Sequence, residues 1–303
     1  MRKSVLLPAA AVAGGVVGLV VRRVYLANGF EAGTGLPIAG APSLWAMAIV
    51  TVVVLGLLVA LSCGKHKNYT QCYTGAFYSE HTVCIAGMLA GAVLLGVGGF
   101  LALANWFSSP SLGLMEKPLR RELSVTWLYL GIFCLLAAAG IYFVTQKMRR
   151  KEPILTAWAA MPTLAGCLWV VANYYDNWAE EPVLGHYAIP MLATGLSMLG
   201  CMMIGAMGFD KARISTTLAF SLSGASVCIM ALADGLNWAN TAILLGMVFY
   251  QLSMASALIA NDDHAPGLPA CAAHCEACHG CAPMGTMPKK KKKAKKKNNE
   301  SGK

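Results

Sequence analysis

The scarcest property of this sequence is charge. Only 13% of its 303 residues are Asp, Glu, Lys or Arg, whereas 57% are apolar. A soluble domain carries about 25% charged residues, roughly twice that fraction. The mean hydropathy is +0.57. These values argue against an ordinary soluble protein and predict a chain that lies largely in lipid.

Ionisable residues are missing from the centres of the long apolar runs. Charged groups inside a bilayer are costly and usually mark proton or ion pathways. Their absence argues against a proton-coupled pump or a voltage sensor. Histidine is also scarce near these runs, and His186 is the only one beside a run. A haem with two axial histidines therefore has no second ligand.

Catalytic signatures are missing as well. The sequence contains no nucleophile–base motif, no phosphate-binding loop and no zincin motif. The balance is against an enzyme, although an active site assembled from distant helices would leave no local motif. Enzymatic activity therefore stays an open question.

Eight apolar runs dominate what is present. A membrane-spanning helix needs about 20 mostly apolar residues, because only a helix satisfies its whole backbone internally in lipid. The first run also resembles a signal peptide with AVA at residues 11–13 as a cleavage site, but its apolar stretch is short and we expect an uncleaved span. The runs cover residues 4–21, 44–62, 85–104, 125–146, 154–173, 183–208, 215–233 and 239–260.

These runs predict an all-α fold. We expect a polytopic membrane helix bundle of about eight transmembrane helices over residues 1–260, followed by a disordered cytoplasmic C-terminal tail over residues 261–303. Glycines recur inside several runs, with Gly14 and Gly18 in the first and a group between residues 87 and 99 in the third. Small residues let helix backbones approach closely, so we expect them at helix contacts.

The distribution of basic residues predicts the orientation. With eight spans, both termini lie on one side, and placing them in the cytoplasm puts ten basic residues of the connecting segments inside and five outside. This follows the positive-inside bias. Six of the seven tryptophans then fall at or near the outer face, where indole rings anchor helices. We expect a multi-pass protein of the cell membrane with both termini in the cytoplasm. The five outer residues are Arg22, Arg23, Lys117, Arg120 and Arg121.

The connection between the fifth and sixth runs is the most polar part of the membrane region. Trp169 and the residues four, seven and eleven positions later share one helix face. Pro162 and Pro190 interrupt the flanking runs, which frees backbone carbonyls. These features predict an acidic, aromatic pocket for a cation or amine, and the alternative is a solvated loop with an aromatic belt. The candidate substrate-binding residues are Asn173, Asp176, Glu180, Glu181, His186 and Asp234.

The tail carries four thiols within eleven residues, with two histidines between them. Four thiolates can hold one tetrahedral ion, and thiolates select Zn, Cu(I) or an iron–sulfur cluster. Unmetallated thiols are the main alternative. The sequence CEACH at residues 275–279 also matches the c-type haem attachment motif, which a cytoplasmic tail of this length argues against. We predict Zn or another soft metal here, with Cys271, His274, Cys275, Cys278, His279 and Cys281 as candidate ligands.

A lysine-rich segment follows. Nine of the 24 Lys and Arg residues lie in the last 15 positions, and the other 15 nearly balance the 14 acids. Such a segment near a membrane favours contact with anionic lipid, at about 1 kcal/mol per Lys. Non-specific contact with nucleic acid or simple solvation are the alternatives, and no specific nucleic-acid binding is predicted. The lipid bilayer is the expected partner, and the sequence points to no protein partner.

Residues 30–38 (FEAGTGLPI) resemble a loop of uncharacterised multi-pass membrane proteins of anaerobic Gram-positive bacteria. Residues 178–184 (WAEEPVL) are similar to another part of the same group. The resemblance covers the membrane body and not the tail, and it implies a bacterial plasma membrane without an activity. Two classes stay open. The first is a transporter or channel for a small solute or cation with a metal-responsive tail, and the second is a scaffold or sensor whose tail binds a soft metal or a partner.

Overall fold

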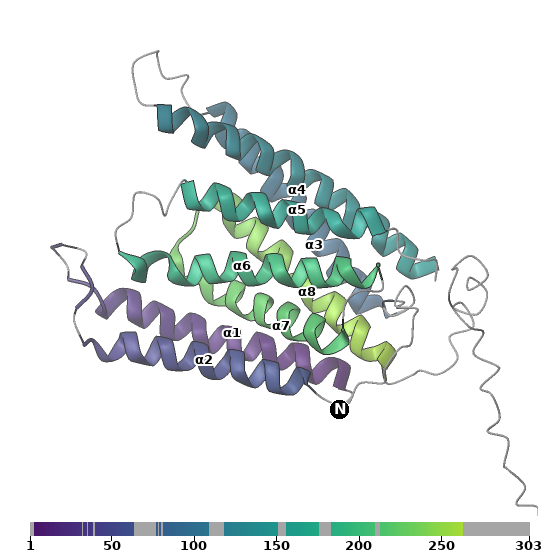
Figure 1. The fold of residues 1–303 in the computed structure, drawn as a ribbon, viewed down its shortest axis with the longest axis horizontal. Coiled ribbons are helices and arrows are strands. Elements are labelled where there is room, and N and C mark those ends of the chain that lie inside the picture. The colour runs from purple at the N-terminus through teal and green to yellow at the C-terminus, as the bar shows by residue number, and fades with distance from the viewer. Residues whose placement is uncertain are drawn as a thin grey trace, which may run out of the picture.

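The computed structural model describes residues 3–31, 33–34, 36–38, 40–63, 77, 79, 81–108, 118–150, 156–175, 183–209 and 213–262. Within these residues the chain forms eight long α-helices and no β-strand, which confirms the all-α prediction (Figure 1). A short 3₁₀ helix, η3, continues the seventh. The helices are α1 (Lys3–Asn28), α2 (Pro42–Ser62), α3 (Thr82–Ser108), α4 (Pro118–Arg150), α5 (Thr156–Asn173), α6 (Leu184–Met207), α7 (Ile214–Ala231), η3 (Leu232–Asp234) and α8 (Trp238–Asp262).

Seven of these helices are long and apolar enough to cross a membrane, and α5 is the exception. The apolar part of α5 is Ala157–Asn173. At 1.5 Å per residue, the helix measures about 27 Å, against a hydrocarbon core of about 30 Å. The expected eight spans are therefore seven long apolar helices and one shorter one. The chain is a polytopic helical membrane protein.

Six helices form a closed ring. Each helix from α3 to α8 packs against the next, and α8 packs back against α3. Helices α1 and α2 lie side by side along one edge of the bundle, where α1 packs against α7 and α8 (Figure 1). Because α7 and α8 contact α1 in addition to their neighbours in the ring, they are the most buried helices. Most of the apolar residues of α2 are exposed, which suits a helix that faces lipid.

Glycines lie at the closest helix contacts, as predicted. A Cβ atom on Gly91 of α3 would lie 3.0 Å from the carbonyl oxygen of Gly246 in α8. Between α3 and α4, a Cβ on Gly99 would lie 2.9 Å from the carbonyl oxygen of Gly131. The ring is therefore held by backbone-to-backbone packing, which lacks room for larger side chains.

Helices that follow one another along the chain run in opposite directions, so the neighbours α1 and α7 run in the same direction. Arg22, near the end of α1, contacts Gly185 at the start of α6 and Asp234 at the end of η3. Asn173, at the end of α5, contacts Asn240 at the start of α8. We call this side of the bundle the Asp234 end. Its predicted outward orientation in the cell stays a prediction.

Helix α1 extends beyond its apolar run. It ends at Asn28 rather than at residue 21, so Arg22 and Arg23 lie inside the helix, and their assignment to the first outer loop is wrong. After the helix, Phe30 forms an isolated antiparallel bridge with Pro37. The Phe30 ring lies over the start of α6, with its centroid 4.2 Å from that of the His186 ring.

Candidate functional site

A buried ion pair links α1 to η3 at the Asp234 end. The Arg22 side chain is 1% exposed and the Asp234 side chain 5%. The Nε atom of Arg22 donates to Oδ1 of Asp234 at 2.9 Å, and Nη2 donates to the same oxygen. A buried charge is tolerated only when it is paired and hydrogen-bonded, and ionisable groups in membrane helices often mark functional sites.

The same guanidinium also binds the start of α6. Nη1 of Arg22 donates to the carbonyl oxygen of Gly185, and Nη2 donates to that of His186, both at 2.9 Å. Inside a helix, the His186 carbonyl would accept from the N–H four residues later, but that residue is Pro190, which has none. Arg22 supplies the missing donor. The expectation that this proline frees a carbonyl is confirmed.

Aromatic rings cover this ion pair. The Cζ atom of Arg22 lies 5.3 Å from the centroid of the Tyr25 ring, close enough for a cation–π interaction. The Tyr25 and Phe30 ring centroids are 5.1 Å apart. Among the described residues, neither the Tyr25 hydroxyl nor Oδ2 of Asp234 has a hydrogen-bond partner. The pair is thus shielded from solvent while one carboxylate oxygen keeps its capacity to accept.

A second polar network crosses the ring from α5 to α8. Nε1 of Trp169 donates to Oδ1 of Asn240 at 2.8 Å, and Nδ2 of Asn240 donates to Oδ1 of Asn173 at 2.8 Å. Nδ2 of Asn173 donates to the Trp169 carbonyl oxygen at 3.0 Å. All three side chains are buried. Trp169 is therefore a core hydrogen-bond donor, whereas tryptophans such as Trp238 are exposed like interfacial anchors.

A small cavity of about 10 Å³ adjoins this network. That volume is close to the minimum that holds one water molecule. Pro190 and Ala231, which lie four and three residues from His186 and Asp234 in the sequence, contribute to its wall. The indole, amide and hydroxyl groups in its lining belong to Trp169, Asn173, Thr194 and Asn240, and Leu244 contributes on α8.

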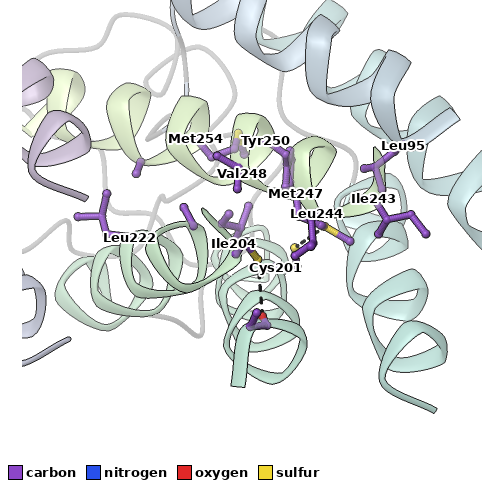
Figure 2. Packing of buried hydrophobic residues seen from close by; sticks show 14 of the residues in the cluster. Leu95, Cys201, Ile204, Leu222, Ile243, Leu244, Met247, Val248, Tyr250 and Met254 are labelled. Carbon is purple, nitrogen blue, oxygen red and sulfur yellow. Dashed lines mark hydrogen bonds between the residues drawn. The ribbon is translucent and has the colours of Figure 1, made fainter. Parts of the chain in front are cut away.

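Sulfur atoms and an amide meet about one to two turns further along α6 and α8. The Sγ atom of Cys201 lies 3.7 Å from Sδ of Met247. Figure 2 shows these two side chains on facing helices, within the buried apolar cluster. Nε2 of Gln251 donates to the carbonyl and hydroxyl oxygens of Ser197 at 2.8 Å, and it lies 3.6 Å from Cys201 Sγ.

The predicted substrate-binding residues that the structure describes belong to two separate groups. His186 and Asp234 come together around Arg22, whereas Asn173 belongs to the Asn240 network. Asp176, Glu180 and Glu181 lie outside the described residues, so a pocket shared by all six stays a prediction.

Sequence reasoning missed Arg22 and Asn240. Arg22 was assigned to a loop because it follows an apolar run, and Asn240 is a single amide inside a run. The one available signal was Pro190, whose freed carbonyl requires a donor from elsewhere.

Metal ligands cannot be placed in the tail, because Cys271, His274, Cys275, Cys278, His279 and Cys281 lie outside the described residues. Within the part of the chain that the structure describes, no group of three or more His, Cys, Asp or Glu side chains is arranged for a metal ion. The described cysteines are free thiols, and Cys84, Cys134, Cys201 and Cys228 are buried. The last three behave as small apolar residues of the bundle interior, as expected for Cys within spans.

The fold and these sites define a helical membrane protein with a buried ion pair and a buried polar network that joins α5 to α8. No protein-family model matches the chain, and comparison with curated proteins and with solved structures found no match.

Proposed function

We propose that the chain transports a small polar solute or cation along the interior of the α3–α8 ring. The observation that supports this most directly is the cavity beside Trp169, Asn173 and Asn240, a water-sized space inside the ring near the Asp234 end whose lining includes indole, amide and hydroxyl groups. Buried amides are costly unless they are satisfied. Such amides join membrane helices, and beside a water-sized space they also offer hydrogen bonds to a solute.

The path is closed in this structure. Leu244 lines the cavity, and one turn further along α8 Met247 packs against Cys201. In this proposal, the path opens when α6 moves. The Arg22 interactions oppose that movement, because they hold the two carbonyls at the start of α6. In this proposal, the Arg22–Asp234 pair holds the closed arrangement and its release permits passage.

The chemistry of the interior restricts the solute. Around the cavity, the described lining residues are amide, indole, hydroxyl and apolar groups without charge. A hydrated hard cation gains little from such groups. An uncharged solute, or a cation that is neutralised by its own ligand, suits the site better. Asp176, Glu180 and Glu181 would raise the concentration of cations at the entrance.

Replacing Asn240 with Leu should abolish transport. Because it leaves the buried Trp169 N–H without its acceptor, it should also cost about 1–3 kcal/mol of stability, so fluxes are compared for equal amounts of folded protein. The change removes the amide that joins α5 to α8 and fills the cavity with an apolar side chain. In proteoliposomes that hold the unmodified chain, the influx of urea and of methylammonium should exceed the influx into protein-free liposomes. At least one of these two fluxes should fall at least tenfold in Asn240→Leu.

The matched control is Thr241→Val. Thr241 neighbours Asn240 on α8, and its hydroxyl donates to the backbone carbonyls of Leu236 and Asn237, so its flux should equal that of the unmodified chain. Equal fluxes in Asn240→Leu and Thr241→Val would contradict the proposed path. So would the absence of any flux above protein-free liposomes.

We propose in addition that the tail binds a soft metal and makes transport responsive to it. Four thiols and two histidines at the spacing of residues 271–281 support this. Elemental analysis of the purified chain should find about one equivalent of Zn or Cu more than in a chain that lacks residues 265–303. A metal content that is unchanged by this deletion rejects the tail site.

A further inference from the structure

We propose that a cleft between α2 and α6 binds one acyl chain of an ester-linked glycerolipid, whose ester carbonyl accepts a hydrogen bond from Tyr25. The cleft has a volume of about 250 Å³. Helices α1 and α2 pack against α7, and so does α6, but among the described residues α6 makes no extensive helix contact with α1 or α2. The long side chains of Arg22 and Tyr25 bridge the space that this arrangement leaves.

The size and the walls of the cleft suit an apolar ligand. An apolar cavity of about 150 Å³ is already large enough to bind benzene and stays free of water. Val52, in the α2 wall, is 69% exposed, so the cleft opens sideways toward lipid. The apolar side chains of the lining are Leu44, Met47, Ala48, Val52, Ala188 and Ile189.

The Tyr25 hydroxyl is the observation that points to a particular kind of ligand. Tyr25 lines the cleft and is 2% exposed, yet its hydroxyl has no hydrogen-bond partner among the described residues. A Cβ atom on Gly185 would lie 2.5 Å from this oxygen, so the hydroxyl lies between the α1 and α6 walls. Buried polar groups are nearly always partnered. An acceptor oxygen on the ligand would satisfy this donor.

The other polar side chains of the lining already have partners. Arg22 donates to Asp234 and to two backbone carbonyls of α6. The Thr51 hydroxyl donates to the Met47 carbonyl oxygen at 2.8 Å. Because Asp234 neutralises Arg22, the cleft offers no uncompensated charge to an anion. The part of the ligand that enters should therefore be uncharged and carry an acceptor, as an ester carbonyl does and a phosphate or carboxylate does not.

The position of the cleft along the helices matches the depth of a lipid ester. Tyr25 lies three residues before the end of α1, about 4.5 Å along the axis, whereas Thr51 lies nine residues into α2, about 14 Å from its start. The cleft therefore runs from the interfacial region at the Asp234 end into the hydrocarbon core. One ester group and the upper part of its chain cover this range, and the surrounding bilayer supplies such lipids in excess.

A bound chain would also affect the proposed transport. It would lie beside Ala188 and Ile189 of α6 and oppose any movement of α6 toward α2. This consequence rests on the proposed function, whereas the lipid site does not. Lipid binding without any solute flux would reject transport and leave the site intact.

The test compares two lipids by native mass spectrometry of the full chain in detergent. One is a diacyl phosphatidylcholine, and the other is its dialkyl ether analogue, which has the same head group and chains but no carbonyl. The unmodified chain should bind the first ester lipid about fivefold more tightly than the first ether lipid, as expected for one hydrogen bond. Tyr25→Phe keeps the ring that packs against Phe30 and Arg22 and should bind both lipids equally.

A second variant tests the cleft itself. Ala48→Phe fills it from α2 and should weaken the binding of both lipids by roughly fivefold or more. Ala46→Phe is the matched control, because it makes the same change on the same helix at a residue that does not line the cleft. Tyr129→Phe, at an exposed position of α4, should keep the preference for the ester lipid.

Three results would overturn the proposal. The first is equal affinity of the unmodified chain for the two lipids, and the second is an ester preference that survives in Tyr25→Phe. The third is equal lipid binding by Ala48→Phe and Ala46→Phe. Displacement of the ester lipid by an equimolar quinone such as menadione would also overturn it and assign the cleft to a quinone.

Discussion

Replacing Arg22 with Met should lower the free energy of unfolding by about 3–5 kcal/mol. The substitution removes three interactions at once, because Arg22 pairs with Asp234 and donates to the carbonyls of Gly185 and His186. It leaves the carboxylate buried without its counter-charge and removes the Arg22 donor from the His186 carbonyl. Unfolding by SDS in mixed micelles, followed by tryptophan fluorescence, measures the change.

The double variant separates charge from packing. Arg22→Met with Asp234→Leu should recover most of the lost stability, because an apolar pair of similar volume needs no counter-charge. Arg23 is the matched control, since it is the next residue of α1 and its side chain is exposed. Arg23→Met should change stability by less than about 0.5 kcal/mol. A similar loss in Arg22→Met and Arg23→Met would show that the buried pair does not stabilise the bundle.

Replacing Gly91 with Leu should destabilise the bundle by about 3 kcal/mol or more. A Cβ at this position meets the Gly246 carbonyl oxygen at 3.0 Å and the Tyr250 amide nitrogen at 3.1 Å. These are backbone atoms of α8, so no side-chain rotation can relieve the contact. Helices α3 and α8 must separate, which opens one contact of the ring.

The same substitution at Gly56 provides the control. Gly56 lies in α2, and a Cβ there has no heavy atom within 4 Å. Because Leu favours a helix over Gly by about 0.8 kcal/mol, Gly56→Leu should be neutral or stabilising. Thermal unfolding of both variants in the same detergent compares them. Equal melting temperatures would mean that the α3–α8 contact is not a tight one.

The sequence predicts the helices well because lipid imposes a simple rule on their length. The second run was placed at 44–62 and α2 covers Pro42–Ser62, and the sixth was placed at 183–208 and α6 covers Leu184–Met207. The end of α1 was missed because two arginines interrupt the apolar run. Hydropathy treats them as the start of a loop, although Arg has a high helix propensity and its long apolar stem packs against neighbouring helices.

The candidate site was predicted only in parts. His186 and Asp234 could be selected as polar residues beside apolar runs, but their common partner Arg22 lies 212 positions from Asp234. No local pattern encodes such a pairing. Likewise, the spacing of Trp169 and Asn173 correctly indicates a shared helix face, yet the residue that both contact is Asn240 on α8. Helix faces can be inferred from spacing, whereas the facing helix comes only from the packed bundle.

The separation of Arg22 from its partner also concerns the synthesis of the chain. At about 5–20 residues per second, Asp234 emerges from the ribosome roughly 10–40 s after Arg22. Throughout that interval, the guanidinium has neither its carboxylate nor, until α6 is made, the two carbonyls that it later binds. During this interval, the long apolar stem of Arg22 lets its guanidinium reach the lipid headgroups. Helix α1 therefore reaches its final packing only after η3 has been made, although it enters the bilayer before α6 and α7 do.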